Sequence, residues 1–474
     1  MVDHDRKTKM ISSDMPSKSP RISNKLQVST PTVPIIRLTE LSAASDSVFS
    51  AYEHYLRLPE LKKLWTSLEF PSWKNELLLK PALQGLETTF RFISIVLSDR
   101  RPYANRREWK RRLEALAMNQ IEIIALLCED EDDQKTAPVG DLTSSTSVLA
   151  RQNSSAEVWK LSDETTVVSQ TSEDSLLPRL AAWQKSEDIA HKIMYSIECQ
   201  MRKCPYTLGL GEPNLSGKPS LDYDAVVKPS ELHALKKSPS DRMNLENYEN
   251  QTLYTTHQIL ETWIHASKML LKRISDRINR EDLEKAVNDC WLLEKTWKLL
   301  TEIEDLHLLM DPDDVLRLKN QLSIKATAES ELFCFRSKGL VEITKLSKDL
   351  KHKVPNILDV EVDPQGWPRI QEAAIELFRK KESFEKIHLL QALQAIEMAV
   401  KRFYYSYKQL LVIVIGSLEA KGNTPFMAVD SSDALAQIFL EPTYFPSLDA
   451  AKTFLGEYWS HEHGRYSPER KSKA

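Results

Sequence analysis

The chain has 474 residues, of which 41% are hydrophobic and 28% charged, and its formal net charge is −4. This length and composition predict a globular protein of two or three domains or subdomains. A general nucleic-acid binder needs a basic surplus, which this chain lacks. The longest strongly apolar run, residues 410–415, is far too short to span a bilayer. We therefore expect neither nucleic acid nor a membrane as a partner.

The cysteines indicate a reducing compartment. There are five, an odd number, and none forms a C-x-x-C pair. The first residues, MVDHDRKTKM, contain no apolar core of the kind that a secretory signal requires. The predicted location is the cytoplasm, with the nucleus as the alternative.

The first 177 residues divide into three segments by composition. Residues 1–45 are rich in Ser, Pro, Thr and Lys without periodicity, which is typical of a disordered tail. Residues 46–129 carry apolar side chains at helical spacing, with breaks at Pro71 and Pro102, and predict an N-terminal helical region. Residues 130–177 are acidic and rich in Ser and Thr, so we expect a flexible insertion.

Long helices dominate the rest of the chain. Residues 178–250 predict one helix followed by an extended linker marked by Pro and Gly. Residues 251–474 predict a C-terminal bundle, with helices from about Leu253 to Ile278 and from Asp282 to about Met310 and further helices downstream. No convincing strand pair is visible anywhere. The predicted fold class is all-α, a helical bundle.

One polar residue lies on an inward helix face. Apolar or small residues recur at steps of three and four along the first long helix, and His257 falls on the same stripe. An inward histidine is more often a hydrogen-bonded core residue than a catalytic one. The surrounding residues, THQILETW at 256–263, are more specific. They resemble the active-site helix of the haem-dependent tryptophan and indoleamine 2,3-dioxygenases.

The resemblance extends over roughly residues 215–460 and implies a ligand site. A downstream segment ends in Phe335–Arg336, where the dioxygenase family has an arginine that binds the substrate carboxylate. The likeness thus implies a pocket for an indolic carboxylate, in which His257 meets the indole N–H and Arg336 the carboxylate. The implied lining residues are Leu253, Tyr254 and Phe335, and Thr424 matches a Thr of the family's later loop.

The haem ligand of that family is missing. The dioxygenases hold iron through a histidine on a late helix, and the matching helix here has Tyr407 or Ser406 at that position, depending on the alignment. No histidine occurs between His388 and His461. A tyrosine can ligate haem iron, so Tyr407 is the one haem-ligand candidate. We expect no cofactor, with haem held through Tyr407 as the alternative.

Two Glu-x-x-His pairs offer a different metal site. Glu304 pairs with His307 and Glu385 with His388, each on a predicted helix. Di-iron bundles use such pairs together with a Glu from each of two other helices. About one such pair is expected by chance in this composition. A di-iron site is therefore a weaker hypothesis than a haem or indolic-ligand site.

Segments distributed over nearly the whole chain point to a second family. The stretches YEHYLRLPELKKLW, RPYANRREWKRRL, KCPYTLGLGEPNLSGKP and KHKVPNILDVEVDP resemble the plant nematode-resistance protein family called HSPRO. That resemblance implies a stress-inducible regulator of basal defence that associates with the SNF-related kinase complex through its βγ-type regulatory subunit. No catalytic activity is implied.

Together these observations predict a binding or scaffold protein of plant defence. The alternative is a haem-dependent indole dioxygenase-like enzyme or a sensor of an indolic ligand. For the kinase subunit, we expect the docking surface to lie in residues 46–128 and outside the His257 site, because the helix stripe places that site inside the protein.

Overall fold

The computed structural model describes about three fifths of the chain, and every structural statement below concerns these residues. They are 52–68, 75–98, 103, 105–129, 158–160, 166–168, 176, 187–205, 207–208, 223–236, 248–315, 337–361, 369–381, 383–415 and 438–465. The predicted tail, residues 1–45, and most of the predicted insertion, residues 130–177, lie outside them.

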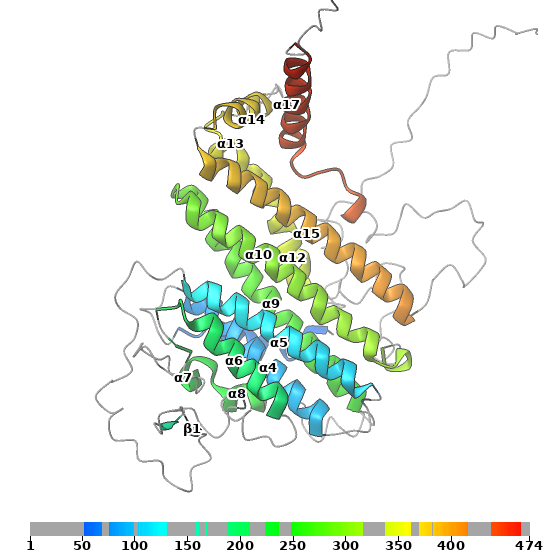
Figure 1. Ribbon diagram of the computed structural model, residues 1–474. Coiled ribbons are helices and arrows are strands. Elements are labelled where there is room, and N and C mark those ends of the chain that lie inside the picture. The colour runs from blue at the N-terminus through cyan, green and yellow to red at the C-terminus, as the bar shows by residue number, and fades with distance from the viewer. Residues whose placement is uncertain are drawn as a thin grey trace, which may run out of the picture.

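The described chain is helical almost throughout, which confirms the predicted all-α class (Figure 1). Before the long helices come α3 (Leu58–Thr66), α4 (Glu76–Ser98), α5 (Arg106–Glu129), α6 (Glu187–Met201), α7 (Tyr223–Val227) and α8 (Pro229–Ala234). The later elements are α9 (Tyr248–Asn279), α10 (Leu283–Glu304), the 3-10 turn η4 (Asp305–Leu309), α12 (Lys338–Asp349), η7 (Leu350–Lys353), α13 (Val354–Ile357), α14 (Arg369–Lys380), α15 (Phe384–Ile415) and α17 (Pro446–Arg465). No described helix is long and apolar enough to cross a membrane.

One short strand pair corrects the prediction that the chain has none. Strands β1 (Val158–Lys160) and β2 (Thr166–Val168) pair antiparallel, with Trp159 opposite Val167. Both lie in the stretch that was predicted to be an irregular insertion. Three residues are too few for a period of two to stand out from the surrounding polar sequence, so the pattern carried no signal.

Helix α9 lies at the centre of the bundle. It packs against α4 on one side and α10 on another, and α12 covers a third part of it (Figure 1). Consequently nearly every side chain from Thr252 to Ser267 is buried, polar ones included. The spacing of apolar residues predicted one buried stripe on an amphipathic helix. From Thr252 to Ser267, however, α9 has no solvent-exposed face.

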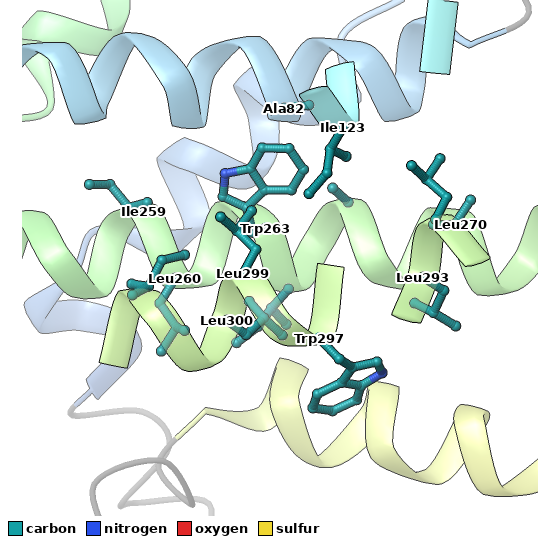
Figure 2. Close-up of a cluster of buried hydrophobic side chains, with 14 of the residues drawn as sticks. Ala82, Ile123, Ile259, Leu260, Trp263, Leu270, Leu293, Trp297, Leu299 and Leu300 are labelled. Carbon is teal, nitrogen blue, oxygen red and sulfur yellow. The ribbon is translucent and has the colours of Figure 1, made fainter. Parts of the chain in front are cut away.

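The tryptophan of α9 ties three helices together. The indole N–H of Trp263 donates to Oε1 of Gln120 on α5 at 2.9 Å, and the amide of Gln120 donates to the hydroxyl of Thr89 on α4 at 2.8 Å. The indole also lies against the backbone of Gly85, where a Cβ would come within 2.8 Å of Nε1. Figure 2 shows the Trp263 ring beside Ala82 and Ile123, whereas Trp297 of α10 points the opposite way.

An enclosed charge cluster joins α9 to α10. Asp289 on α10 is fully buried, and its carboxylate accepts hydrogen bonds from the guanidinium of Arg273, including one from Nε at 2.9 Å. Nη1 of Arg277 lies 2.9 Å from Oδ2 of the same carboxylate. Arg273 also donates to the side chain of Asn75, just before α4. A buried carboxylate is stable only when its charge is matched in this way.

The later helix α15 packs on α10, where the rings of Trp297 and Phe403 meet edge to face at 5.4 Å.

Candidate functional site

Five titratable side chains lie together inside the bundle, and we call them the His257 cluster. They come from the helical turn before α3 (Tyr52), from α9 (His257 and Glu261) and from the end of α10 and η4 (Glu304 and His307). Each is at most 6% exposed. The inward orientation that helical spacing predicted for His257 is therefore confirmed. Its surroundings are polar, however, and come from three separate parts of the chain.

Two rings flank the imidazole of His257. The ring of Tyr52 stands edge to face with it at a centroid distance of 5.9 Å. The ring of His307 lies tilted at 5.2 Å. Because aromatic rings at these distances are in contact, both directions are already filled by the protein.

The carboxyl group of Glu261 is held by two hydroxyl groups. The phenol of Tyr52 donates to Oε1 at 3.1 Å, and the hydroxyl of Ser337 donates to the same carboxyl group. Ser337 is also the N-cap of α12, where its oxygen accepts from the backbone N–H of Leu340 at 3.0 Å. Burial raises the pKa of Glu261 to about 7, since the loss of water outweighs these two hydrogen bonds, which lower it.

Glu304 and His307 form a second pair one helical turn apart. In the tautomer with a proton on Nδ1, His307 donates to the backbone carbonyl oxygen of Glu304 at 2.7 Å, and Oε2 of Glu304 lies 3.2 Å from the same nitrogen. Burial, and to a smaller extent the charges of Asp305 and Glu261, raise the pKa of Glu304 to about 8. Burial lowers the pKa of His307 to about 4. At neutral pH this contact is therefore between two uncharged groups.

The raised pKa values allow the two buried carboxyl groups of the cluster to stay protonated near neutral pH. A carboxylic acid that remains protonated near neutral pH donates as well as accepts, so Glu261 and Glu304 can satisfy their neighbours without a counter-ion. This arrangement provides order and a pH-dependent stability. It does not present a charged nucleophile or base to solvent.

The metal hypotheses find little support in this geometry. No group of three or more His, Cys, Asp and Glu side chains within the described ranges has an arrangement that could hold a metal ion. Of the two Glu-x-x-His pairs, Glu304–His307 is buried in the cluster, whereas Glu385 and His388 are exposed on α15. The structure therefore does not bring the two pairs together as the di-iron hypothesis requires.

A haem also does not fit beside His257. The rings of Tyr52 and His307 occupy two sides of its imidazole, where a porphyrin would need open space. Tyr407, the candidate iron ligand, is buried on α15 and stacks on Phe403 at 6.2 Å. Its phenol is thus part of the α15 core.

Only some of the ligand-binding residues that the dioxygenase resemblance implies lie in the described part of the chain. Leu253 is fully buried in the core. Tyr254 is buried, but its hydroxyl donates to the carbonyl oxygen of Leu235, next to α8, at 2.8 Å, and its ring meets Tyr55 edge to face. Tyr254 thus anchors the α8 segment. Phe335, Arg336 and Thr424 lie outside the described residues, so the indolic-carboxylate site remains a prediction.

Two members of the site were not predictable from local sequence. Tyr52 lies 209 residues before Glu261, and Ser337 reaches it from a different helix. Neither residue stands in a motif that indicates a polar contact. The Glu304–His307 pair was visible in the sequence, but as a possible metal pair.

Both halves of the chain match one family. A family model described as the Hs1pro-1 N-terminus matches residues 1–198, and one described as the Hs1pro-1 protein C-terminus matches residues 201–461. The chain belongs to the Hs1pro-1 family, as its resemblance to HSPRO proteins predicted. The boundary between the two matches falls at the end of α6, and α4 from the first half packs on α9 from the second.

Two relatives from Arabidopsis thaliana are similar over their full length. The nematode resistance protein-like HSPRO2 is 52% identical over 468 residues, and the nematode resistance protein-like HSPRO1 is 51% identical over 464 residues. Each comparison covers 97% of this chain and 100% of the relative. No solved structure gives a significant match. A role related to nematode resistance in plants thus belongs to this family, whereas the dioxygenase resemblance remains a prediction.

Proposed function

We propose that this protein acts in plant basal defence by binding other proteins, as a regulator or scaffold. The observation that carries the proposal is the enclosure of the His257 cluster. Tyr52, His257, Glu261, Glu304 and His307 are all at most 6% exposed. Four of them form two hydrogen-bonded pairs, Tyr52 with Glu261 and His307 with Glu304. Such pairs inside a core stabilise a fold, whereas catalytic groups must reach a substrate.

The proposed partner is the βγ-type regulatory subunit of the SNF-related kinase complex, and the proposed location is the cytoplasm. This partner is suggested by the family alone. Within residues 46–128, α4 and α5 are core helices that contact α9 or α10. Removal of this region would therefore unfold the protein, and a loss of binding would not identify a surface.

Surface substitutions on α5 give a sharper test. The exposed positions of α5 share one face of the helix. They are Arg107, Arg111, Ala115 and Met118. We expect Arg111→Glu combined with Met118→Glu to weaken binding of the purified regulatory subunit at least tenfold in a calorimetric titration. His257→Ala should leave binding within twofold. If the α5 variant binds normally while wild-type protein binds, the docking surface lies elsewhere. If the wild-type protein does not bind, the proposed partner is wrong.

A further inference from the structure

The exposed apolar side chains of this protein gather near its C-terminus. Among the described residues, eleven large hydrophobic side chains are exposed. Five of them lie on α15, and two more lie in the C-terminal segment, at residues 440 and 454. The α15 set consists of Phe384, Met398, Tyr405, Val412 and Ile413. Single exposed apolar residues need no explanation, but a concentration on one helix marks a site of contact.

These side chains follow the length of the helix. Met398, Tyr405 and Val412 are seven residues apart and are exposed by 61%, 52% and 45%. A seven-residue repeat places them in one row along a helix, which is the pattern by which one helix packs against another. Helix α15 packs on α10, beside which it runs (Figure 1). Because the three side chains are exposed, the row faces away from that contact.

A groove of about 750 Å³ runs along this row. Met398, Arg402 and Tyr405 line it from α15, and Phe439, Thr443 and Lys452 line it from the C-terminal segment. The rings of Tyr405 and Phe439 meet edge to face at 5.5 Å and form an aromatic contact across it. Its lining on α15 extends from Gln391 to Tyr405 and mixes apolar with charged side chains, which suits an amphipathic helix laid lengthwise.

Two acidic side chains line the groove, Glu397 and Asp449, against three cations, Lys401, Arg402 and Lys452. Asp449 accepts a hydrogen bond from the side chain of Gln394, and Glu397 is neutralised by a cation. Glu397 accepts a hydrogen bond from the backbone N–H of Tyr444 at 3.0 Å, and its Oε1 lies 2.8 Å from Nζ of Lys401. Lys401 also donates to the carbonyl oxygen of Glu441 at 2.9 Å. This ion pair belongs to the internal structure that fixes the C-terminal segment on α15.

The guanidinium of Arg402 is in a different situation. It lies between Met398 and Tyr405 on the exposed row. Among the described residues, its Nη2 contacts the sulfur of Met398 at 4.0 Å. A second cation, the ammonium group of Lys408, lies 5.9 Å from the Phe439 ring. The apolar row therefore carries positive charge at its middle, where an acidic partner would be favoured and a second copy of α15 would bring like charges together.

We propose that the α15 groove, defined by Met398, Arg402, Tyr405, Phe439, Thr443 and Lys452, binds an acidic amphipathic helix of a partner protein. The apolar face of that helix covers Met398 and Tyr405, and one of its carboxylates pairs with Arg402. This surface is separate from the α5 face to which the kinase subunit is assigned above, and the inference does not require that subunit as the partner.

A designed peptide tests the chemistry of the groove directly. The probe is a fluorescently labelled, cross-linked 21-residue helix with leucine at every first and fourth heptad position and glutamate on its flanks. Its controls are the same peptide with lysine in place of glutamate and a sequence of equal composition without an apolar face. Fluorescence anisotropy with the full-length protein should show binding of the acidic helix and at least tenfold weaker binding of both controls.

Two variants locate the binding. Arg402→Glu and Met398→Gln should each weaken binding of the acidic helix at least tenfold, whereas Met118→Gln, an equally conservative change at an exposed methionine on α5, should have no effect. Equal binding of the acidic and basic helices, or unchanged binding to both α15 variants, would overturn the proposal. Light scattering that shows a dimer of the wild-type protein and a monomer of Met398→Gln would overturn it too, because the occupant would then be a second copy. If the α15 variants lose the peptide but keep the regulatory subunit, the two surfaces are distinct.

Discussion

The hydroxyl group of Tyr52 donates a hydrogen bond of 3.1 Å to the carboxyl group of Glu261, across 209 residues of sequence. The contact connects the turn before α3 to the centre of α9, and both side chains are buried. It thus ties the start of the described chain to the His257 cluster.

Removal of that hydroxyl should destabilise the protein without changing its shape. Tyr52→Phe keeps the ring beside His257 but leaves Glu261 with one donor fewer, so we expect a loss of about 1–3 kcal/mol in the free energy of unfolding. Urea denaturation measures it. Tyr405→Phe, at an exposed position of α15, should change stability by less than about 0.5 kcal/mol. Equal effects of the two substitutions would show that the Tyr52 contact contributes nothing.

Stability should fall as the pH rises from 6.5 to 8. The pKa values of Glu261 and Glu304 are raised to about 7 and about 8, so between pH 4.5 and 8 the folded protein holds protons that the unfolded chain releases. Their contribution is therefore complete at low pH and is lost through this window. His265 and His307, whose pKa values are lowered to about 4, act in the opposite direction between pH 4 and 6.5. Above pH 6.5, of these four groups only the carboxyl groups of Glu261 and Glu304 still change the stability with pH.

A variant separates this effect from other titrations. One proton retained by the folded protein from pH 6.5 to 8 corresponds to at most about 2 kcal/mol. Glu304→Gln should remove most of the decline between pH 6.5 and 8, measured by urea denaturation at each pH. Glu376→Gln on α14 should leave the decline unchanged. Lys380 lowers the pKa of the Glu376 carboxyl group, so this group does not titrate between pH 6.5 and 8. A wild-type stability that is flat or rising over this range would show that the cluster is charged in the folded protein.

The buried Asp289 should be among the most sensitive positions of the core. Asp289→Asn preserves the shape of the side chain but leaves the guanidinium groups of Arg273 and Arg277 without their shared carboxylate. We expect a loss of about 3–5 kcal/mol. Asp282→Asn changes a half-exposed carboxylate just before the same helix and should cost little. Thermal or urea unfolding compares the two, and similar losses would show that the cluster is not specifically stabilising.

A glycine on α4 should resist substitution although its helix favours alanine. Alanine at position 85 gains about 1 kcal/mol in helix propensity. Its Cβ would lie 2.8 Å from Nε1 of Trp263, and the indole cannot move without breaking its hydrogen bond to Gln120. We expect Gly85→Ala to destabilise by about 1–3 kcal/mol, as overpacked cores do. Gly456→Ala on α17, where a Cβ meets nothing within 4 Å, should be neutral or stabilising. Destabilisation by both changes to the same extent would contradict the steric explanation.

The helices were predictable because their apolar spacing is long and regular. The expected helix from about Leu253 to Ile278 corresponds to α9, and the next one to α10 followed by η4. The strand pair was missed because three residues carry no measurable period.

The site was predictable only in part, because local sequence does not encode tertiary contacts. Helical spacing placed His257 inside correctly. It could not reveal that the opposite face of α9 is buried as well, which depends on how α4 and α12 pack on it. Nor could it identify Tyr52 as a partner of Glu261. The family resemblance supplied a pocket at His257, whereas the structure fills two sides of that imidazole with protein rings.

The most direct test of this account is haem reconstitution followed by a tryptophan turnover assay. If the His257 cluster is a closed part of the core, the purified protein should form no stable haem complex detectable by its absorption spectrum. It should also produce no N-formylkynurenine from tryptophan under reducing, aerobic conditions. A stable one-to-one haem complex with product formation that is lost in His257→Ala or Tyr407→Phe would contradict the account and show that the protein is an enzyme.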